Sequence, residues 1–243
     1  ARDVHLAVVG TTPPELGKAV RERARTTITA GLSEADVVPE QVTVGPNGRA
    51  RVSIDGHAFT LPNAGLHLAA NAMLAWAVAR ALDLDLAACA GALEQVTLPE
   101  GRGEVITSGS MTIVNDAYNA NPESFAAAIE TARAMRGSRP LVFVAGTMRE
   151  LGPQSDTLHA EVMRRLAELR PAILAVVGDF VPASASHAAE LGTRLLTAPD
   201  PVALGPLLAE RLAGDELVFL KASRGVALER RLPYLIDGTD SRR

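Results

Sequence analysis

The sequence is poor in several residue types on which whole classes of protein depend. Its 243 residues include one cysteine, Cys89, so no disulfide can form within the chain and a reducing compartment is expected. Aromatic residues make up only 3%, too few for the stacking platforms that bind unpaired bases. The longest apolar stretch runs from Leu68 to Ala79, is interrupted by Asn71 and is shorter than the roughly 20 residues that span a bilayer.

Charge and hydrophobicity are those of a folded globular protein. The 24 basic and 28 acidic residues give a formal net charge of −4, which argues against nucleic acid or an anionic membrane as the partner. The 47% of hydrophobic residues exclude a disordered chain. A chain of this length buries roughly 70% of its unfolded surface and needs no metal to hold a core. The first apolar run is too short for a signal peptide, so we expect a cytoplasmic protein.

Several catalytic signatures are missing. The segment 10–19, GTTPPELGKA, resembles a phosphate loop only superficially, because six residues separate its glycines and Ala19 follows Lys18. Its two prolines also remove backbone N–H donors, so we predict an ordinary turn from strand to helix. The histidines lack metal-ligand spacing, there is no Gly-x-Ser-x-Gly elbow, and Cys89 suits a core position better than a nucleophile. We predict no metal site within this chain.

The apolar pattern divides the chain at about residue 100. The first part predicts a strand at 4–9, a helix at 14–26 with a basic outer face, a β-hairpin with a meander at 41–61, and helices at 67–82 and 86–96. The helix at 67–82 is apolar all round, which is typical of a buried helix.

The second part alternates short apolar runs with amphipathic segments. After a hairpin at 104–116, strands are predicted at 141–146, 172–179, 195–198 and 216–223, with helices at 122–135, 155–169, 182–192, 201–212 and 225–236. This alternation indicates βαβ units and therefore an α/β fold with a mostly parallel sheet. Ligands of such sheets bind at the carboxyl ends of the strands, so the chemistry is expected there.

Polar residues follow the predicted strand ends. Asp116 ends a strand, where a carboxylate can accept ribose hydroxyls. Asn121 before Pro122 reads first as a helix cap, but capping does not account for Tyr118 and Asn119.

Three further groups each allow a functional or a structural interpretation. Lys221 and Arg224 in LKASRG form either an anion site or two solvated charges. Arg102, between two glycines, either clamps a phosphate or is an exposed hinge residue. His67 and Asn71, four residues apart, share a helix face and form either a ligand contact or a satisfied structural pair.

Taken in order, five segments resemble motifs of the Mur ligase family. They are GLHLAANAMLA (65–75), EGRGE (100–104), NDAYNANPES (115–124), AGTMRELGPQSDTLHAEV (145–162) and LKASRGVALE (220–229). The segment at 115–124 is the most specific, and it is similar to the branch of the family that adds D-alanyl-D-alanine. The matching stretch covers residues 65–229.

The resemblance implies a three-domain ligase of peptidoglycan synthesis that depends on ATP and Mg²⁺. ATP phosphorylates a substrate carboxylate, and the amine of D-alanyl-D-alanine attacks the acyl phosphate. The acceptor is UDP-N-acetylmuramoyl-tripeptide, and the enzyme is expected to be a cytoplasmic monomer. By the same resemblance, residues 1–100 are the C-terminal part of a central ATP-binding domain, and residues 101–243 are a Rossmann-like C-terminal domain.

The resemblance also assigns roles to single residues. Those expected to bind ATP are His67 and Asn71 on the adenine side, Arg102 at the phosphates and Asp116 at the ribose. Arg102 and Lys221 are the candidate catalytic residues. Those expected to shape the substrate site or to place the dipeptide or tripeptide are Tyr118, Asn119, Asn121, Ser223 and Arg224.

The sequence departs from the family pattern in two ways. Leu68, Thr147 and Ala222 stand where the family has Asn, Asp and Gly. Nothing matches the UDP-binding domain, the phosphate loop or the residues that hold magnesium, so we expect this chain alone to be inactive and the metal ligands to lie outside it. The alternative is a stand-alone nucleotide- or peptide-binding module without catalysis. The YNANP sequence at 118–122 argues against a third option, a folate or cyanophycin-type ligase.

Overall fold

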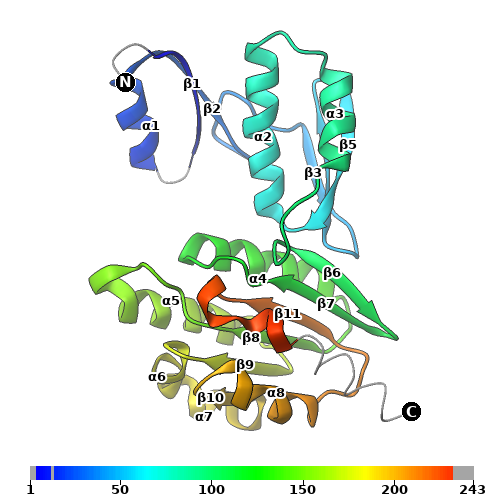
Figure 1. Cartoon of the computed structure of the whole chain (residues 1–243), viewed down its shortest axis with the longest axis vertical. Helices are drawn as coiled ribbons and strands as arrows, with labels where there is room; N and C mark the ends of the chain where they lie inside the picture. The colour runs from blue at the N-terminus through cyan, green and yellow to red at the C-terminus, as the bar shows by residue number, and fades with distance from the viewer. Residues whose placement is uncertain (1–3, 12–13, 232–243) are drawn as a thin grey trace. The chain divides into compact units, whose positions relative to one another are not determined.

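The computed structural model describes residues 4–11 and 14–231, which form two compact units (Figure 1). Apart from the turn at 46–48, the first unit comprises the chain up to Thr97, and the second unit begins at Leu98. The division therefore falls three residues before the predicted boundary. None of the helices in the described part of the chain combines the length and the apolar character that a bilayer crossing requires.

The described residues of the first unit form two small sheets and three helices. Its strands are β1 (Val4–Gly10), β2 (Ala24–Ala30), β3 (Gln41–Val44), β4 (Arg49–Ile54) and β5 (His57–Ala64). Its helices are α1 (Pro14–Arg21), α2 (Leu66–Ala81) and α3 (Leu86–Gln95). Strands β1 and β2 form a parallel pair, whereas β3, β4 and β5 form the antiparallel meander that the sequence predicted.

The predicted helix at 14–26 was wrong in its second half. Helix α1 ends at Arg21, and β2 begins at Ala24, so Arg23 and Arg25 do not extend a helical basic face. The segment ARTTITA is rich in β-branched residues, which lose side-chain freedom in a helix and pack well in a strand.

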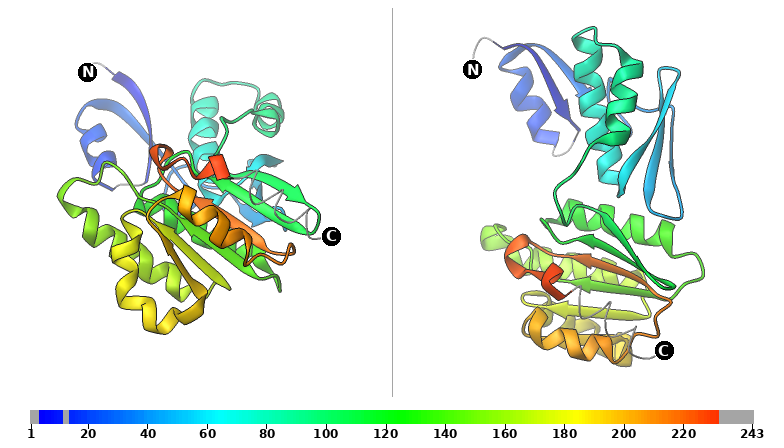
Figure 2. Two further views of the ribbon diagram at one scale, coloured as in Figure 1. Left: turned by 60° about the horizontal axis from the view of Figure 1, so that its bottom comes forward. Right: turned by 45° about the vertical axis from the view of Figure 1, so that its right-hand side comes forward.

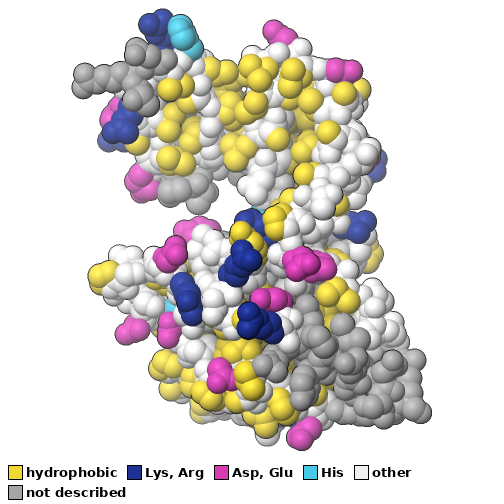
Figure 3. All heavy atoms as spheres, in the orientation of Figure 1, with side chains coloured by type: hydrophobic (Ala, Val, Ile, Leu, Met, Phe, Trp, Pro, Cys, Tyr) yellow, Lys and Arg dark blue, Asp and Glu magenta, His cyan; other side chains and the backbone are white. Residues whose placement is uncertain are grey.

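Helix α2 provides the core of the first unit. Met73 and Trp76 are fully buried, the Trp76 ring stacks on Phe59 at 5.6 Å, and the Trp76 Nε1–H donates to Asp55 Oδ2 at 2.9 Å. The helix is not buried all round as predicted, because Val78 is 41% exposed. Figure 3 shows hydrophobic side chains spread over the visible face of this unit.

Up to residue 231, the second unit is built on a sheet of six strands. Its strands are β6 (Glu104–Ser108), β7 (Met111–Asp116), β8 (Leu141–Ala145), β9 (Ile173–Val177), β10 (Leu195–Ala198) and β11 (Leu217–Lys221). They are arranged in the order β10-β9-β8-β11-β7-β6, and every pair is parallel except β6 with β7. The predicted α/β fold with a mostly parallel sheet is confirmed.

The helices of this unit differ from the prediction at two places. They are α4 (Pro122–Arg136), α5 (Ser155–Glu168), α6 (Phe180–Ser184), α7 (Ala188–Leu191) and α8 (Pro201–Ala209). The predicted helix at 182–192 is interrupted by a 3₁₀ turn at 185–187, within a Ser-Ala-Ser-His run that includes weak helix formers. The predicted helix at 225–236 is replaced, up to residue 231, by 3₁₀ turns at 224–226 and 228–231 on either side of left-handed Ala227, and 232–236 lie outside the described residues.

Alternation along the strands explains how both faces of the sheet are covered. Val142 and Val144 of β8 share an apolar cluster with Leu204 and Leu208 of α8. Phe143, between them, points to the opposite face, where its ring lies 6.4 Å from that of Phe125 in α4. In the left view of Figure 2, α5 and α6 lie on one side of the strands and α8 on the other.

The position of β11 creates two crevices at one edge of the sheet. The chain leaves β7 and β8 toward the face that carries α4 and α5, whereas the turn after β11 packs against α8 on the other face. Neighbouring chain segments therefore diverge on both sides of the end of β11, between β7 and β11 and between β8 and β11. In open α/β sheets, ligands bind where connections diverge in this way.

Candidate functional site

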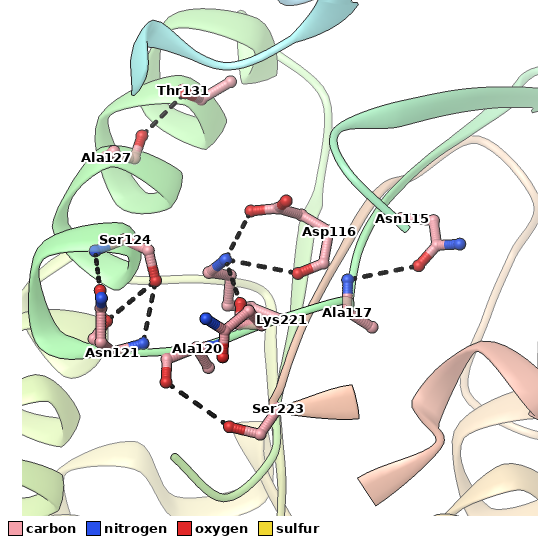
Figure 4. Close-up of polar contacts among 11 residues, drawn as sticks. Asn115, Asp116, Ala117, Ala120, Asn121, Ser124, Ala127, Thr131, Lys221 and Ser223 are labelled. Atoms are coloured by element: carbon pink, nitrogen blue, oxygen red, sulfur yellow. Dashed lines mark hydrogen bonds and ion pairs between the residues drawn. The ribbon is translucent and has the colours of Figure 1, made fainter. Parts of the chain in front are cut away.

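A buried ion pair joins the ends of β7 and β11. Lys221 and Asp116 are the last residues of their strands and are register partners. The Lys221 Nζ donates to Asp116 Oδ2 at 2.7 Å and to the carbonyl of Asn119 at 2.9 Å, with the Asp116 carbonyl at 3.4 Å (Figure 4). Only 2% of Lys221 and 5% of Asp116 is exposed.

The surroundings of Lys221 define what its ammonium can do. Its three donor hydrogens face three oxygens of the protein, which offsets the cost of removing the charge from water. Lys221 thus fixes the end of β7 and the loop that follows it. Its catalytic role stays a prediction, and its ammonium engages one of the two carboxylate oxygens of Asp116.

The loop from Ala117 to Asn121 is held at both ends. The Asn121 Oδ1 accepts the Ser124 N–H at 2.7 Å, and the Ser124 Oγ accepts the Asn121 N–H at 3.0 Å. This capping box begins α4 and confirms the cap interpretation of Asn121. The Tyr118 N–H donates to the carbonyl of Gly101, and the Tyr118 carbonyl accepts the Arg224 N–H. Within this loop, Asn119 is exposed, and its Oδ1 accepts the Ala120 N–H at 2.9 Å.

Three predicted site residues meet at the Tyr118 ring. The guanidinium carbon of Arg102 lies 4.0 Å from the ring centroid, and that of Arg224 lies 5.3 Å away. A hydrogen bond with Arg102, followed by the positive charges of Arg102 and Arg224, lowers the pKa of the Tyr118 phenol. Two arginines from different loops are thus brought together, although each repels the other.

The crevice between β7 and β11 is a cavity of about 310 Å³. Its lining residues are Pro99, Glu100, Gly101, Ala117, Tyr118, Arg224 and Glu229. Sequence reasoning missed Glu229, although it ends the quoted segment at 220–229. Its Oε2 is buried without a hydrogen-bond partner among the described residues. The cavity combines a cationic wall with this carboxylate.

The crevice between β8 and β11 is a cavity of about 430 Å³. Residues 147–152 of the β8–α5 loop, Ser155, Asp179 and Val226 line it. Sequence reasoning missed its charged residues Arg149, Glu150 and Asp179, because three separate loops supply this wall together. Figure 3 shows Lys and Arg side chains gathered on the side of the second unit that carries the loop after β8 and the turns after β11.

Ser223 connects these loops from the inside. Its Oγ accepts the Arg149 N–H at 2.9 Å, and its own N–H donates to the carbonyl of Thr147 at 3.1 Å. Ser223 is only 4% exposed, so its hydroxyl is committed to holding the loops. Its predicted contact with substrate stays a prediction.

Two of the departures from the family pattern have structural roles here. The Thr147 Oγ1 accepts the Asp179 N–H at 2.9 Å and so joins the loops after β8 and β9. Ala222 lies so close to Gly146 that a Cβ on Gly146 would approach the Ala222 Cβ to 2.8 Å. Position 146 therefore has no room for a side chain.

The remaining predicted residues lie in the first unit, at the start of α2. Gly65 precedes the helix with φ +133°, and a Cβ there would approach the His67 ring to 2.5 Å. This explains the Gly-x-His spacing, because only glycine allows both the backbone conformation and the ring position. Asn71 is exposed one turn later, and Leu68 is largely buried.

No group of three or more His, Cys, Asp or Glu that could hold a metal is found in residues 4–11 and 14–231.

The mostly parallel sheet of the second unit, with helices on both faces, is a doubly wound, Rossmann-like fold. The family model described as "Mur ligase, glutamate ligase domain" matches residues 101–224, about half of the chain. The chain belongs to the Mur ligase family.

Curated relatives and solved structures agree with this membership. The UDP-N-acetylmuramoyl-tripeptide–D-alanyl-D-alanine ligase of Treponema pallidum (strain Nichols) is 33% identical over 190 residues, which cover 76% of this chain and 40% of the relative. The ligase of the same name from Bacillus subtilis (strain 168) is 30% identical over 185 residues, 74% of this chain and 40% of the relative. The chain thus spans about two fifths of the length of these relatives.

Among solved structures, MurF from Acinetobacter baumannii superimposes with a TM-score of 0.79 at 28% identity, covering 96% of this chain and 51% of that one. MurF ligase from Thermotoga maritima in complex with ADP superimposes with a TM-score of 0.77 at 25% identity. The match covers 100% of this chain and 56% of that one.

We predict that Lys221→Met destabilises the second unit by about 3–5 kcal/mol, because it leaves the Asp116 carboxylate buried and uncompensated. Urea unfolding followed by circular dichroism measures the loss. Glu130→Ala is the control, since it breaks the exposed Glu130–Arg133 pair at a cost of about 0–1 kcal/mol. The double variant Asp116→Asn/Lys221→Met should recover part of the loss. Equal stability of Lys221→Met and the control would contradict this account.

We also predict that Arg102→Leu raises the pKa of the Tyr118 phenol, because it removes both a hydrogen bond and the nearer positive charge. Absorbance near the tyrosinate band follows the titration, in a Tyr234→Phe background that removes the other tyrosine. Arg133→Leu is the matched control and should leave the titration unchanged. An unchanged Tyr118 titration in Arg102→Leu would show that the two side chains do not interact.

Proposed function

We propose that this chain is the ATP-domain end and the C-terminal domain of a ligase that joins D-alanyl-D-alanine to UDP-N-acetylmuramoyl-tripeptide. The observation that carries the proposal is the convergence of Arg102 and Arg224 on the Tyr118 ring, in the loop after β7 of a Mur ligase domain. The names of the relatives supply the two substrates. ATP and Mg²⁺, cytoplasmic location and a monomeric state belong to the same proposal.

The first unit supports an assignment to a larger ATP-binding domain. Its only parallel sheet among the described residues is the pair β1 and β2, and parallel strands are ordinarily found in larger sheets covered on both faces. Val4 of β1 is 40% exposed, and Leu82 at the end of α2 is 60% exposed. We therefore propose that residues 1–100 complete such a sheet, whose remaining strands and phosphate-binding loop belong to other residues of the ligase.

The β7–β11 crevice has the groups that a nucleotide requires. Arg102 and Arg224 offer planar guanidinium groups that bind phosphate oxygens and neutralise their charge. The second Asp116 carboxylate oxygen can accept a ribose hydroxyl. The resemblance assigns His67 and Asn71 of the first unit to the adenine, and that assignment stays a prediction. ATP supplies the phosphoryl group that activates the substrate carboxylate.

The β8–β11 crevice suits a small zwitterion such as D-alanyl-D-alanine. Asp179 and Glu150 can attract an ammonium group, and Arg149 can pair with a carboxylate. Ser223 lies behind this wall and fixes its loop, whereas Lys221 fixes the loop after β7. The chain's contribution to the reaction is thus to hold the amine in place and to neutralise charge as the phosphoryl group moves.

The alternative is a stand-alone module that binds nucleotide or peptide without catalysis. Both crevices are formed within the second unit alone, which is the observation that favours it. Sequencing the DNA upstream of the codon for Ala1 separates the two. We expect an open frame that encodes a phosphate loop of the form G-T-x-G-K-[ST]. A stop codon followed by a start signal would support the stand-alone module instead.

For the whole ligase, we predict that Arg102→Ala lowers kcat by about 10²–10³-fold, because it removes a preorganised cation from the phosphoryl group. Phosphate release with both substrates and ATP measures the rate. Arg133→Ala, which removes an exposed arginine of α4, should leave the rate unchanged. Equal rates in the two variants would remove Arg102 from the catalytic residues.

A further inference from the structure

His159 is a buried side chain that the proposed chemistry does not use. It lies in the second turn of α5 and is fully buried. Its Nε2 lies 2.9 Å from the backbone N of Met148, and its Nδ1 lies 2.8 Å from the carbonyl oxygen of Ser155. Because an amide N–H can only donate and a carbonyl can only accept, these partners assign the proton to Nδ1 and leave Nε2 as the acceptor.

The bond to Met148 fixes the loop that forms the β8–β11 crevice. Met148 and Arg149 are consecutive, and their amides donate to different elements: Met148 to His159 of α5, and Arg149 to the Oγ of Ser223 after β11. Arg149 also donates from Nη2 to the carbonyl of Gly225 at 3.1 Å. The loop after β8 is thus held by hydrogen bonds to His159 of α5 and to the segment after β11.

The surroundings of His159 hold the ring in a single orientation. Its ring meets that of Phe180 edge-on, with centroids 4.8 Å apart and an interplanar angle of 74°. The Ser155 Oγ is also within 3.2 Å of Nδ1. The ring therefore links the first turn of α5 to the loop after β8. Its Nδ1–H donates to the Ser155 carbonyl, and its Nε2 accepts the Met148 N–H.

We propose that His159 is a positioning residue for the β8–β11 crevice. Its neutral imidazole, protonated at Nδ1, holds the Met148 amide so that the loop presents Arg149 and Glu150 to the incoming dipeptide. The proposal rests on the proposed function for the identity of that ligand. The hydrogen bond between His159 and Met148 does not depend on the proposed function. The positioning role of His159 and the identity of the ligand can therefore be tested separately.

Two variants of similar size separate the two bonds of the ring. In His159→Gln, the amide oxygen reaches the place of Nε2 and can still accept the Met148 N–H. In His159→Asn, the shorter amide reaches only the place of Nδ1 and keeps the bond to Ser155. Each variant loses one hydrogen bond at the same buried site, so a purely structural role predicts equal effects. His187→Gln, at a partly exposed histidine on the same unit, is the background control.

The experiment uses the 243-residue chain labelled with ¹⁵N. The imidazole nitrogens of the unaltered chain should show a protonated Nδ1 and a bare Nε2. Amide exchange of Met148 should stay slow in His159→Gln and become at least tenfold faster in His159→Asn. The Kd for D-alanyl-D-alanine, measured by chemical-shift titration, should stay within about twofold in the first variant and rise roughly tenfold in the second.

Other outcomes overturn the proposal in distinguishable ways. If the two variants show the same Met148 exchange or the same Kd, His159 has only a structural role. A proton on Nε2 in the unaltered chain would contradict the bond to Met148. If the unaltered chain and the His187→Gln control bind no D-alanyl-D-alanine, the assignment of this crevice to the dipeptide fails, and the exchange comparison alone then decides whether His159 positions the loop.

Discussion

The buried pair of Lys221 and Asp116 is the interaction on which the site depends. A charge without a partner is too costly to bury, so each residue requires the other, and their register fixes β11 against β7. The same ammonium also holds the carbonyl of Asn119, and thereby the loop that carries Tyr118. The proposed nucleotide site therefore depends on this pair, because the pair holds the loop whose Tyr118 ring contacts Arg102 and Arg224.

The insertion of β11 between β7 and β8 gives the second unit two crevices rather than one. One has a wall of arginine and tyrosine, and the other has charges of both signs. Ser223 contributes to both through its position behind the loops, since its Oγ accepts from Arg149 and lies 3.5 Å from the carbonyl of Ala120. The proposed reaction joins two substrates, which require neighbouring binding sites. The strand order provides two neighbouring crevices within one sheet.

The sequence predicted much of this fold but not which polar side chains are buried. Alternating apolar runs located the strands of the second unit, and the Asn-Pro pair located the start of α4. The pattern could not show that Lys221 and Ser223 point inward, because that depends on how β11 aligns with β7 and β8, far away in the sequence. Strand β2 was missed because a basic amphipathic pattern outweighed its β-branched residues, and Glu229 because its environment comes from distant loops.

The place of Trp76 has a practical consequence. It is the only tryptophan of the chain, and it lies in the core of the first unit, stacked on Phe59 and bonded to Asp55. The second unit has no tryptophan, so indole fluorescence reports on one unit and is silent about the other. The chain thus contains its own optical reporter, and comparing its emission with the circular dichroism of the whole chain reveals whether the two units melt together or separately.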